Sequence, residues 1–401
     1  MGLDAAGGRG SLPALEARMD FALPDDLLVL QRAVRDFAQR EIAPVAVELD
    51  RAPRFPRATL GKMGEMGLLG ILTPEAYGGL GLGYLAYAVL LEEIAAADAA
   101  HATIASVTNG MPQSLILAHG SEAQRDRWLP RLAAGEAIGA FCLTEPHAGS
   151  DAVALRTRAR RVDGGYRLDG SKAWITSGGE ADVYLVLAKT DPEAGARGIS
   201  AFVLERDTPG LSFGAPERKL GQHAAITTSV AFDDAFVPEE QRLGEEGQGF
   251  VMAMSALDGG RVGIAAQALG IARAAFTAAA RHAEEREAFG RPIREFQAIG
   301  FKLADMATRI EAARLLTQRA AWLLDRGERA TKEVSMAKLS ASEAAVFVCD
   351  AAVQVFGGYG YSADYPVERY LRDARVTTLY EGTSEIQRVV ISRQIHRETA
   401  R

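Results

Sequence analysis

The stretch GFVMAMSALDGGRVGIAAQALGIARAAFTAAARHAEE, residues 249–285, carries apolar residues at helical intervals over an unusual length. A second long stretch of the same kind, FKLADMATRIEAARLLTQRAAWLLDR, covers residues 301–326. Helices this long, with one apolar and one charged face, are typical of bundles, where each apolar stripe is buried against neighbouring helices. The pattern predicts a helical bundle domain over residues 241–401.

The chain before this bundle changes character twice. Residues 19–137 predict a helical domain, because segments such as DDLLVLQRAVRDFAQREI and EAQRDRWLPRLAAG show the same period, with Pro24 at a helix start and Pro44 ending or kinking that helix. Residues 138–240 predict a β-domain from short segments rich in β-branched and aromatic residues: YRLDG, KAWITSGG, VYLVLAK, ISAFVLER and TTSVAFDDAFVP. Residues 1–18 are expected to form a disordered extension. The fold class is therefore mostly α with a central β-domain.

Composition bounds the function. The 401 residues are 48% hydrophobic and 24% charged with a net charge of −7, which argues against a nucleic-acid partner. No uninterrupted apolar run approaches the roughly 18 residues of a membrane span. Cys142 and Cys349 are too few for a disulfide framework, and the histidines lack ligand spacing, so we expect no metal and a reducing, cytoplasmic location.

The segment LYEGTSEIQR, residues 379–388, places one glutamate before a helix start. Ser384 and Gln387 have the spacing of a capping box, and Gly382 lets another molecule approach the backbone. An exposed Glu381 would be an ordinary solvated carboxylate. A buried one would have a raised pKa, which suits a general base near neutral pH.

Two motifs flank the predicted strands. In FCLTEPHAGSD, residues 141–151, Thr144 and Ser150 offer hydroxyl groups and Gly149 allows close backbone approach; the alternative is a plain loop. In KAWITSGG, residues 172–179, a flat cofactor could stack on Trp174 beside Thr176; the alternative is a core tryptophan.

Three further stretches carry glycines or charges. QVFGGYGYS, residues 354–362, has more glycines than a helix C-cap requires, and REAFGRPIREFQ, residues 286–297, joins two long helices. GLGYLA, residues 81–86, fits a loose dinucleotide-binding pattern but lies in a helical region, without the preceding strand that such a site needs.

Five motifs in this order, CLTEPHAGSD, KAWIT, REAFGRPIREFQ, QVFGGYGYSADYPVERYLRD and LYEGTSEIQR, resemble the acyl-CoA dehydrogenase family, and its short-chain, butyryl-type members in particular. The resemblance runs from Met19 to about His396. It implies an N-terminal helical domain, a middle β-barrel-like domain and a C-terminal four-helix bundle. It also implies FAD as cofactor, electron-transfer flavoprotein as electron acceptor, a homotetramer built as a dimer of dimers, and a place in fatty acid β-oxidation.

The resemblance also implies roles for individual residues. Glu381 would be the catalytic base, and the substrate contacts would be Ser150, Asp258, Arg261 and Gly382. Of the residues implied to contact FAD, Gln297 and the stretch from Gln354 to Gly358 would reach it from a neighbouring subunit. The implied FAD contacts are Phe141, Cys142, Leu143, Thr144, Gly149, Ser150, Trp174, Ile175, Thr176, Arg286, Phe289, Gln297, Gln354, Val355, Phe356, Gly357, Gly358, Thr383, Ser384 and Glu385.

In the reaction that the resemblance implies, Glu381 removes the α-proton of an acyl-CoA thioester while the β-hydrogen leaves as hydride to the flavin, giving a trans-2-enoyl-CoA. Some relatives place the base on the first bundle helix, where this chain has Gly260, which cannot act as a base. His147 departs from the glycine commonest in the first motif, and residues 252–256 would form the pocket floor. A branched-chain or carrier-protein-bound thioester, an oxygen-using oxidase and a non-catalytic scaffold remain alternatives.

Overall fold

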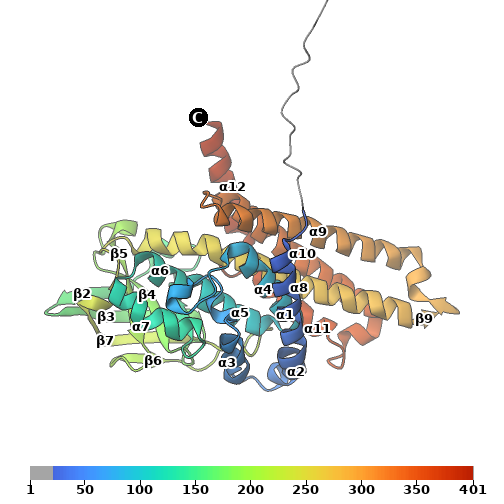
Figure 1. Cartoon of the computed structure of the whole chain (residues 1–401), viewed down its shortest axis with the longest axis horizontal. Helices are drawn as coiled ribbons and strands as arrows, with labels where there is room; N and C mark the ends of the chain where they lie inside the picture. Colours follow the sequence, from blue (N-terminus) through green and yellow to red (C-terminus); the bar gives the residue numbers. More distant parts are fainter. Residues whose placement is uncertain (1–20, 401) are drawn as a thin grey trace, which may run out of the picture.

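The computed structural model describes residues 21–400, and the predicted disordered extension, residues 1–18, lies outside this range. As the sequence predicts, the chain runs from helices through a β-sheet to a bundle of long helices, with the sheet at one end of the elongated molecule and the β9–β10 hairpin at the other (Figure 1).

The N-terminal helices pack into two apolar clusters: α1 to α5 contribute to the larger one, and α6 and α7 to the smaller one. Pro24 precedes α1 as predicted, and a π-helical turn, Ala38–Ile42, bends the chain just before Pro44 in the first turn of α2. Ser121 and Gln124 form a reciprocal capping box that fixes the start of α7. The helices are α1 Asp25–Phe37, α2 Ala43–Arg51, α3 Arg57–Glu65, α4 Gly83–Ala97, α5 Ala99–Thr108, α6 Ser114–His119 and α7 Glu122–Ala133.

The sheet has the strand order β6-β7-β3-β2-β4-β5-β8, and β1 pairs in parallel with β4. YRLDG and KAWIT, expected as separate strands, belong to one strand, β3, because register shifts near Gly170 and Trp174 absorb the irregularities without ending the pairing to β7. The strands are β1 Gly139–Cys142, β2 Arg158–Val162, β3 Gly165–Thr176, β4 Val183–Lys189, β5 Ile199–Glu205, β6 Leu211–Phe213, β7 Thr227–Pro238 and β8 Arg242–Leu243.

Strand β4 is buried on both faces because its successive side chains enter two different apolar clusters. Tyr184 and Val186 pack in the large core shared with the N-terminal helices and the bundle. Val183 and Leu185 pack in a smaller cluster with residues of α6, α7 and the start of α8. Side chains alternate between the two faces of the strand, and because both faces are buried the sequence VYLVLAK is apolar almost without interruption.

Long helices form the C-terminal bundle, and α8 lies at its centre. Its glycines permit close packing: a Cβ at Gly263 would lie 2.5 Å from the hydroxyl oxygen of Tyr87 on α4. By length and hydropathy α8 and the helical segment Thr331–Tyr361 could each cross a membrane, but 72% and 56% of their apolar windows are buried inside the protein. The elements are α8 Gly249–Glu285, β9 Glu287–Ala288, β10 Arg291–Pro292, α9 Gln297–Asp325, α10 Thr331–Phe356, α11 Val367–Arg375 and α12 Ser384–Thr399.

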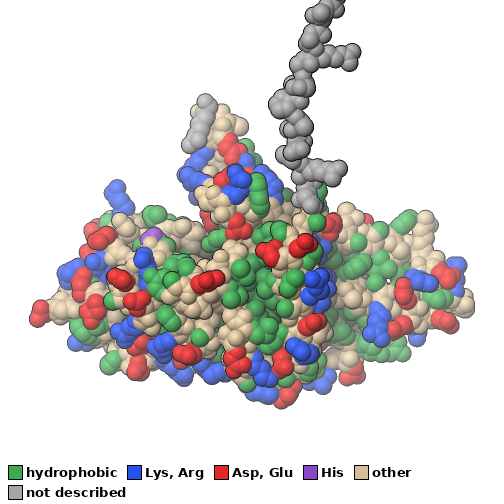
Figure 2. All heavy atoms as spheres, viewed as in Figure 1, with side chains coloured by type: hydrophobic (Ala, Val, Ile, Leu, Met, Phe, Trp, Pro, Cys, Tyr) green, Lys and Arg blue, Asp and Glu red, His purple; other side chains and the backbone are tan. Residues whose placement is uncertain are grey.

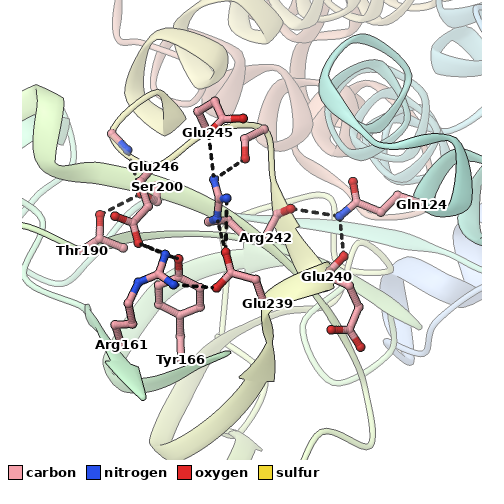
Figure 3. A network of polar contacts seen from close by, with 12 residues as sticks. Gln124, Arg161, Tyr166, Thr190, Ser200, Glu239, Glu240, Arg242, Glu245 and Glu246 are labelled. Carbon is pink, nitrogen blue, oxygen red and sulfur yellow. Dashed lines mark hydrogen bonds and ion pairs between the residues drawn. The ribbon is translucent and has the colours of Figure 1, made fainter. Parts of the chain in front are cut away.

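A polar network anchors the segment that leads from the sheet into α8 (Figure 3). Arg161 on β2 pairs with Glu239 at 3.0 Å and with Glu246 at 2.9 Å. Arg242 on β8 pairs with the same Glu239 at 3.2 Å, and the hydroxyl group of Tyr166 donates to Glu246. The network therefore fixes the direction in which α8 leaves the sheet.

The surface carries both signs of charge. In the view of Figure 2, acidic and basic side chains are interspersed over both ends, and hydrophobic side chains gather near the middle of the face. This mixture agrees with the modest net charge of −7.

Candidate active site

Glu381 lies in a strained turn between α11 and α12. Its φ is 49° and that of the following Gly382 is 88°, so both residues are in the left-handed region. For a residue with a Cβ this conformation costs roughly 1–2 kcal/mol, and it persists only where the surroundings impose it.

The strained turn directs the Glu381 carboxylate onto the first bundle helix. A Cβ built at Gly260 of α8 would lie 2.3 Å from Oε2 of Glu381 and 2.3 Å from the terminal methyl of Met111. The residue as a whole is partly exposed, but Oε2 is buried and has no hydrogen-bond partner within residues 21–400. Gly260 thus provides the space that the carboxylate occupies, and the two alternative positions of the base are adjacent in space.

Burial determines the electrostatics of this carboxylate. Loss of water raises the pKa of Glu381 to about 7, against the lowering effect of the positive charges of Arg261 and Lys338. The predicted buried, raised-pKa glutamate is therefore present, and it titrates where a general base works well at neutral pH.

Two residues hold this turn: Lys338, to which the sequence analysis gave no role, and Gln387, to which it gave a different one. Lys338 on α10 donates to the carbonyl oxygen of Gly382 at 2.8 Å, and Gln387 on α12 donates to the carbonyl oxygens of Glu381 at 3.1 Å and of Gly382 at 3.0 Å. The sequence gives one indication of Lys338's role: this lysine falls among the apolar positions of its helix, on the face that is buried. Such a lysine is also compatible with a side chain reaching the surface, so the sequence could not show its partner.

The predicted capping box at Ser384 and Gln387 is wrong. Thr383 is the N-cap of α12, and its hydroxyl oxygen accepts from the backbone N–H of Ile386 at 3.3 Å. Ser384 lies one residue inside the helix, buried, with an Oγ that has no partner among the described residues. Gln387 instead turns toward the two carbonyl groups of the 381–382 turn, while Glu385 is exposed.

The residues predicted to contact substrate on α8 pair with each other. Arg261 is 6% exposed and donates to Oδ1 of Asp258 at 2.9 Å, and the hydroxyl group of Thr331 donates to Oδ2 of the same aspartate at 2.7 Å. Nε of Arg261 is buried and finds no acceptor within the described part of the chain. This arrangement leaves one donor of a buried cation available near the base.

The loop of the first motif is held by a buried ion pair. Nζ of Lys172 on β3 lies 2.8 Å from Oε1 of Glu145, and also donates to the carbonyl oxygen of Leu143 at 3.1 Å. The N–H of Ala173 donates to the carbonyl oxygen of Thr144 at 2.9 Å. These contacts bring the motifs CLTEPHAGSD and KAWIT side by side, although 20 residues separate them in the sequence.

Trp174 is not a core residue. Its indole is 61% exposed, and its φ of 60° marks the point where the pairing of β3 with β7 shifts register. Ile175 next to it is buried, and Thr176 is partly exposed. The fold therefore strains the backbone to present a flat aromatic surface outward, as the cofactor-stacking alternative predicts and the core alternative does not.

The rest of the first-motif residues differ in exposure. Gly149, Ser150 and His147 are exposed, Phe141 and Thr144 are partly buried, and Cys142 and Leu143 are buried. A Cβ at Gly149 would meet no atom within 4 Å, so the predicted room for close approach exists. Leu143 and Phe141 contact the same apolar cluster as Met111, Met252 and Ala256, which connects this loop to the predicted pocket floor and, through Met111, to the space beside Gly260.

A third group of predicted cofactor residues gathers at the far end of the bundle. The ring of Phe356 at the end of α10 stacks on His282 near the end of α8, with centroids 4.1 Å apart, and Arg286 lies over the ring of Tyr359 at 5.6 Å. Val355 and Phe356 are buried, whereas the others are exposed: Arg286, Phe289, Gln297, Gln354, Gly357 and Gly358. The β9–β10 hairpin in this group lies at the opposite end from the sheet that carries Trp174 (Figure 1). One chain therefore does not bring these residues together with Trp174.

Several observations fit a flavin nucleotide. Trp174 is 61% exposed, and Gly149, Gly357 and Gly358 leave open space where a Cβ would stand. A groove of about 430 Å³ next to the third group contains Gln354; its lining residues are Lys302, Asp305, Phe347, Asp350, Ala351 and Gln354.

Comparison with known proteins is consistent along the whole chain. Residues 24–136, 140–235 and 247–396 match the models of the N-terminal, middle and C-terminal domains of acyl-CoA dehydrogenases. The chain is 52% identical to an acyl-CoA dehydrogenase of Bacillus subtilis over 92% of its length and 97% of the relative's. It is 49% identical to the mitochondrial short-chain specific acyl-CoA dehydrogenase of Mus musculus, covering 92% of this chain and 90% of the relative.

Solved structures agree. Butyryl-CoA dehydrogenase from Megasphaera elsdenii matches with a TM-score of 0.92 and 44% identity, over 94% of this chain and 100% of that one. The predicted family and fold are thus confirmed, and the chain belongs to the acyl-CoA dehydrogenase family.

Proposed function

We propose that this acyl-CoA dehydrogenase oxidises short-chain acyl-CoA thioesters, of about four carbons, to trans-2-enoyl-CoA, with Glu381 as the base and FAD as the hydride acceptor. The observation that carries the proposal is the Glu381 carboxyl group beside Gly260, whose Oε2 is buried without a partner among residues 21–400 and whose pKa is about 7. A sequence identity of 49% to a mouse short-chain enzyme and of 44% to a bacterial butyryl-CoA dehydrogenase supports the acyl length.

Proton transfer is the step that this chain's own residues perform. With a pKa of about 7, the Glu381 carboxyl group titrates near neutral pH, and the ionised Oε2, lacking a hydrogen-bond partner among residues 21–400, is free to accept the α-proton. The C–H electron pair moves into the new α,β double bond as the β-hydrogen leaves with its own pair. FAD, when bound, supplies the acceptor for that hydride.

The cations near Glu381 have a second role. Charge develops on the thioester carbonyl as the α-proton leaves, and a buried positive environment stabilises it. Arg261, whose Nε has no acceptor in the described part of the chain, and Lys338 are the cations that act on the Glu381 carboxylate. Gly260 and Met111 keep the surroundings small and apolar, which keeps water away from the carboxylate.

The quaternary arrangement is part of the proposal. Because the third group lies far from Trp174 within one chain, we infer that it completes the FAD site of a neighbouring subunit in a homotetramer. The 95% exposed Phe289 supports this inference, as do the partly exposed apolar side chains along α9 and α10: Phe301, Trp322 and Phe347. A native mass corresponding to a monomer, with FAD bound, would contradict it.

A panel of thioesters tests substrate and reaction together. Butyryl-, octanoyl-, isobutyryl- and isovaleryl-CoA, and a butyryl carrier protein, are mixed anaerobically with the purified enzyme while the absorbance of oxidised flavin is followed. We expect butyryl-CoA to bleach the flavin fastest. Reoxidation by electron-transfer flavoprotein but not by air within a turnover is expected as well. A protein that binds no FAD, or that no thioester bleaches, would refute the proposal.

A further inference from the structure

Lys338 lies outside every motif that the sequence analysis singled out, and Gln387 lies in LYEGTSEIQR with only a capping role predicted for it; both are fully buried next to the proposed base. Each has an exposed fraction of 0%. Their three contacts go to only two carbonyl oxygens, those of Glu381 and Gly382, at 2.8, 3.0 and 3.1 Å. Buried donors of this kind are costly unless paired, so their pairing with one short turn requires an explanation.

The turn needs an external clamp. The left-handed φ values of 49° and 88° at Glu381 and Gly382 are unfavourable for the glutamate, and relaxation of this residue to an ordinary conformation would swing its side chain away from Gly260. Lys338 approaches the turn from α10 and Gln387 from α12, so two helices restrain it independently. The backbone N–H groups of the turn remain outside this clamp.

We propose that Lys338 and Gln387 are positioning residues for the base: together they hold the left-handed turn that keeps the Glu381 carboxylate against Gly260, and Lys338 in addition supplies a positive charge that favours its ionised form. The inference rests on the proposed role of Glu381. It assigns the clamp a geometric part, shared by both residues, and an electrostatic part, which belongs to Lys338 alone.

The charges around the turn make the two parts separable. The groups that interact electrostatically with the Glu381 carboxylate are Arg261 on α8, Lys338 on α10 and the phenols of Tyr87 on α4 and of the preceding Tyr380. Burial lowers the pKa of Lys338, the Glu381 carboxylate opposes this effect and Arg261 adds to it, and the resulting pKa is about 8. Lys338 also faces Glu343 and Glu385. Gln387 carries no charge, so its loss can change geometry but not the charge near the base.

The test compares Lys338→Met, Lys338→Arg and Gln387→Met with wild type, using FAD-loaded enzyme, butyryl-CoA and an artificial electron acceptor over a range of pH. Lys332→Met is the matched control, because Lys332 also lies on α10 and pairs with α12, but through Glu398 at the C-terminal end of α12, at 2.6 Å, and not through the turn at its start. We expect both methionine variants at the clamp to lose roughly 10- to 100-fold in kcat, and the control to keep its rate.

The pH profile separates a positioning role from a merely structural one. Loss of the ammonium raises the pKa of Glu381, so the ascending limb of kcat/KM should move to higher pH by about one unit in Lys338→Met. The limb should stay in place in Gln387→Met and return toward wild type in Lys338→Arg. Rates and limbs like those of wild type in both methionine variants would overturn the inference.

Two further outcomes are decisive. If Glu381→Gln is inactive while both clamp variants behave as wild type, the clamp fails and the proposed function stands; if Glu381→Gln is active, the proposed function itself fails. Should Lys338→Met yield no folded protein, Gln387→Met decides, because a wild-type kcat in that variant contradicts the clamp.

Discussion

Two buried lysines lie near glutamates in this molecule, and they are used in opposite ways. In the middle domain Lys172 contacts Glu145 directly at 2.8 Å, and the same carboxylate accepts from the N–H groups of Arg156 and Thr157 and from the hydroxyl group of Thr157. In the bundle Lys338 donates to the carbonyl oxygen of Gly382, and Oε2 of Glu381 has no partner in residues 21–400.

The pKa values follow from this difference. Burial alone would raise the pKa of Glu145, but Lys172 and the hydrogen bonds from the Thr157 hydroxyl group and the Arg156 N–H lower it below its ordinary value. At Glu381 burial dominates and the pKa rises to about 7. A carboxylate whose oxygens are fully hydrogen-bonded holds a loop in place, whereas one with a free oxygen retains the capacity to take a proton.

Replacement of Glu381, the carboxylate with a free oxygen, is expected to have the largest effect on turnover. Glu381→Gln should keep FAD and the fold but lose about 10³- to 10⁴-fold in kcat, because the amide cannot accept the α-proton. Turnover of butyryl-CoA, measured on variant and wild type with equal flavin content, checks this. Activity within tenfold of wild type would contradict it.

Replacement of Glu145, the fully hydrogen-bonded carboxylate, should lower the free energy of unfolding instead. Glu145→Gln leaves the Lys172 ammonium buried without its counter-charge, which costs about 3–5 kcal/mol. The double variant Glu145→Gln with Lys172→Met should recover most of that loss, since no charge then remains buried. Chemical unfolding measures both.

A surface ion pair provides the control for that cycle. Glu328 pairs with Arg326 at 2.6 Å while roughly half exposed, and Glu328→Gln should change the free energy of unfolding by no more than about 0.5 kcal/mol. A Glu145→Gln variant as stable as this control would remove the contrast between the two lysines.

A single methyl group should disturb the space that the base occupies. In Gly260→Ala the new Cβ would lie 2.3 Å from Oε2 of Glu381, so the carboxylate must move. We expect kcat to fall about 10- to 100-fold with little loss of stability. Gly61→Ala on α3, where a Cβ meets nothing within 4 Å, is the matched control and should retain wild-type turnover.

The smallest effect concerns the residue before the base. The hydroxyl group of Tyr380 donates to Oε1 of Gln267 on α8 at 2.6 Å, and Tyr380→Phe leaves that buried acceptor unpaired, at a cost of about 1–2 kcal/mol. Thermal unfolding should show the loss, whereas Tyr361→Phe, at a position 91% exposed, should show none. Equal stabilities of the two variants would argue against a structural role for this bond.

The sequence predicts the parts of this molecule that depend on local pattern. The helices α8 and α9, the strands β4, β5 and β7, and the position of the connection between α8 and α9 follow from spacing and turn residues, whereas the β9–β10 hairpin in that connection was not predicted. A glutamate before a helix start, beside a glycine, also marks Glu381 as a candidate base.

Side-chain partners over long range are what sequence pattern does not contain. Lys338 and Gly382 are 44 positions apart, and Glu145 and Lys172 are 27 apart, so no local rule connects them. Gln387 fits a capping box by spacing, but Thr383 has the extended backbone of an N-cap, and the carbonyl groups of the strained turn attract the amide. The two-way burial of β4 likewise depends on elements distant in sequence.

Infrared titration of the Glu381 carboxyl group, recorded as the difference between wild type and Glu381→Gln, examines the base directly. The folded-state pKa lies above the ordinary value of 4.5, so the protonated form stabilises the fold at low pH and this contribution is lost as pH rises through about 7. We expect the carboxyl band to disappear with a midpoint near pH 7. A midpoint near 4.5 would show a solvated carboxylate and contradict its role as a desolvated base.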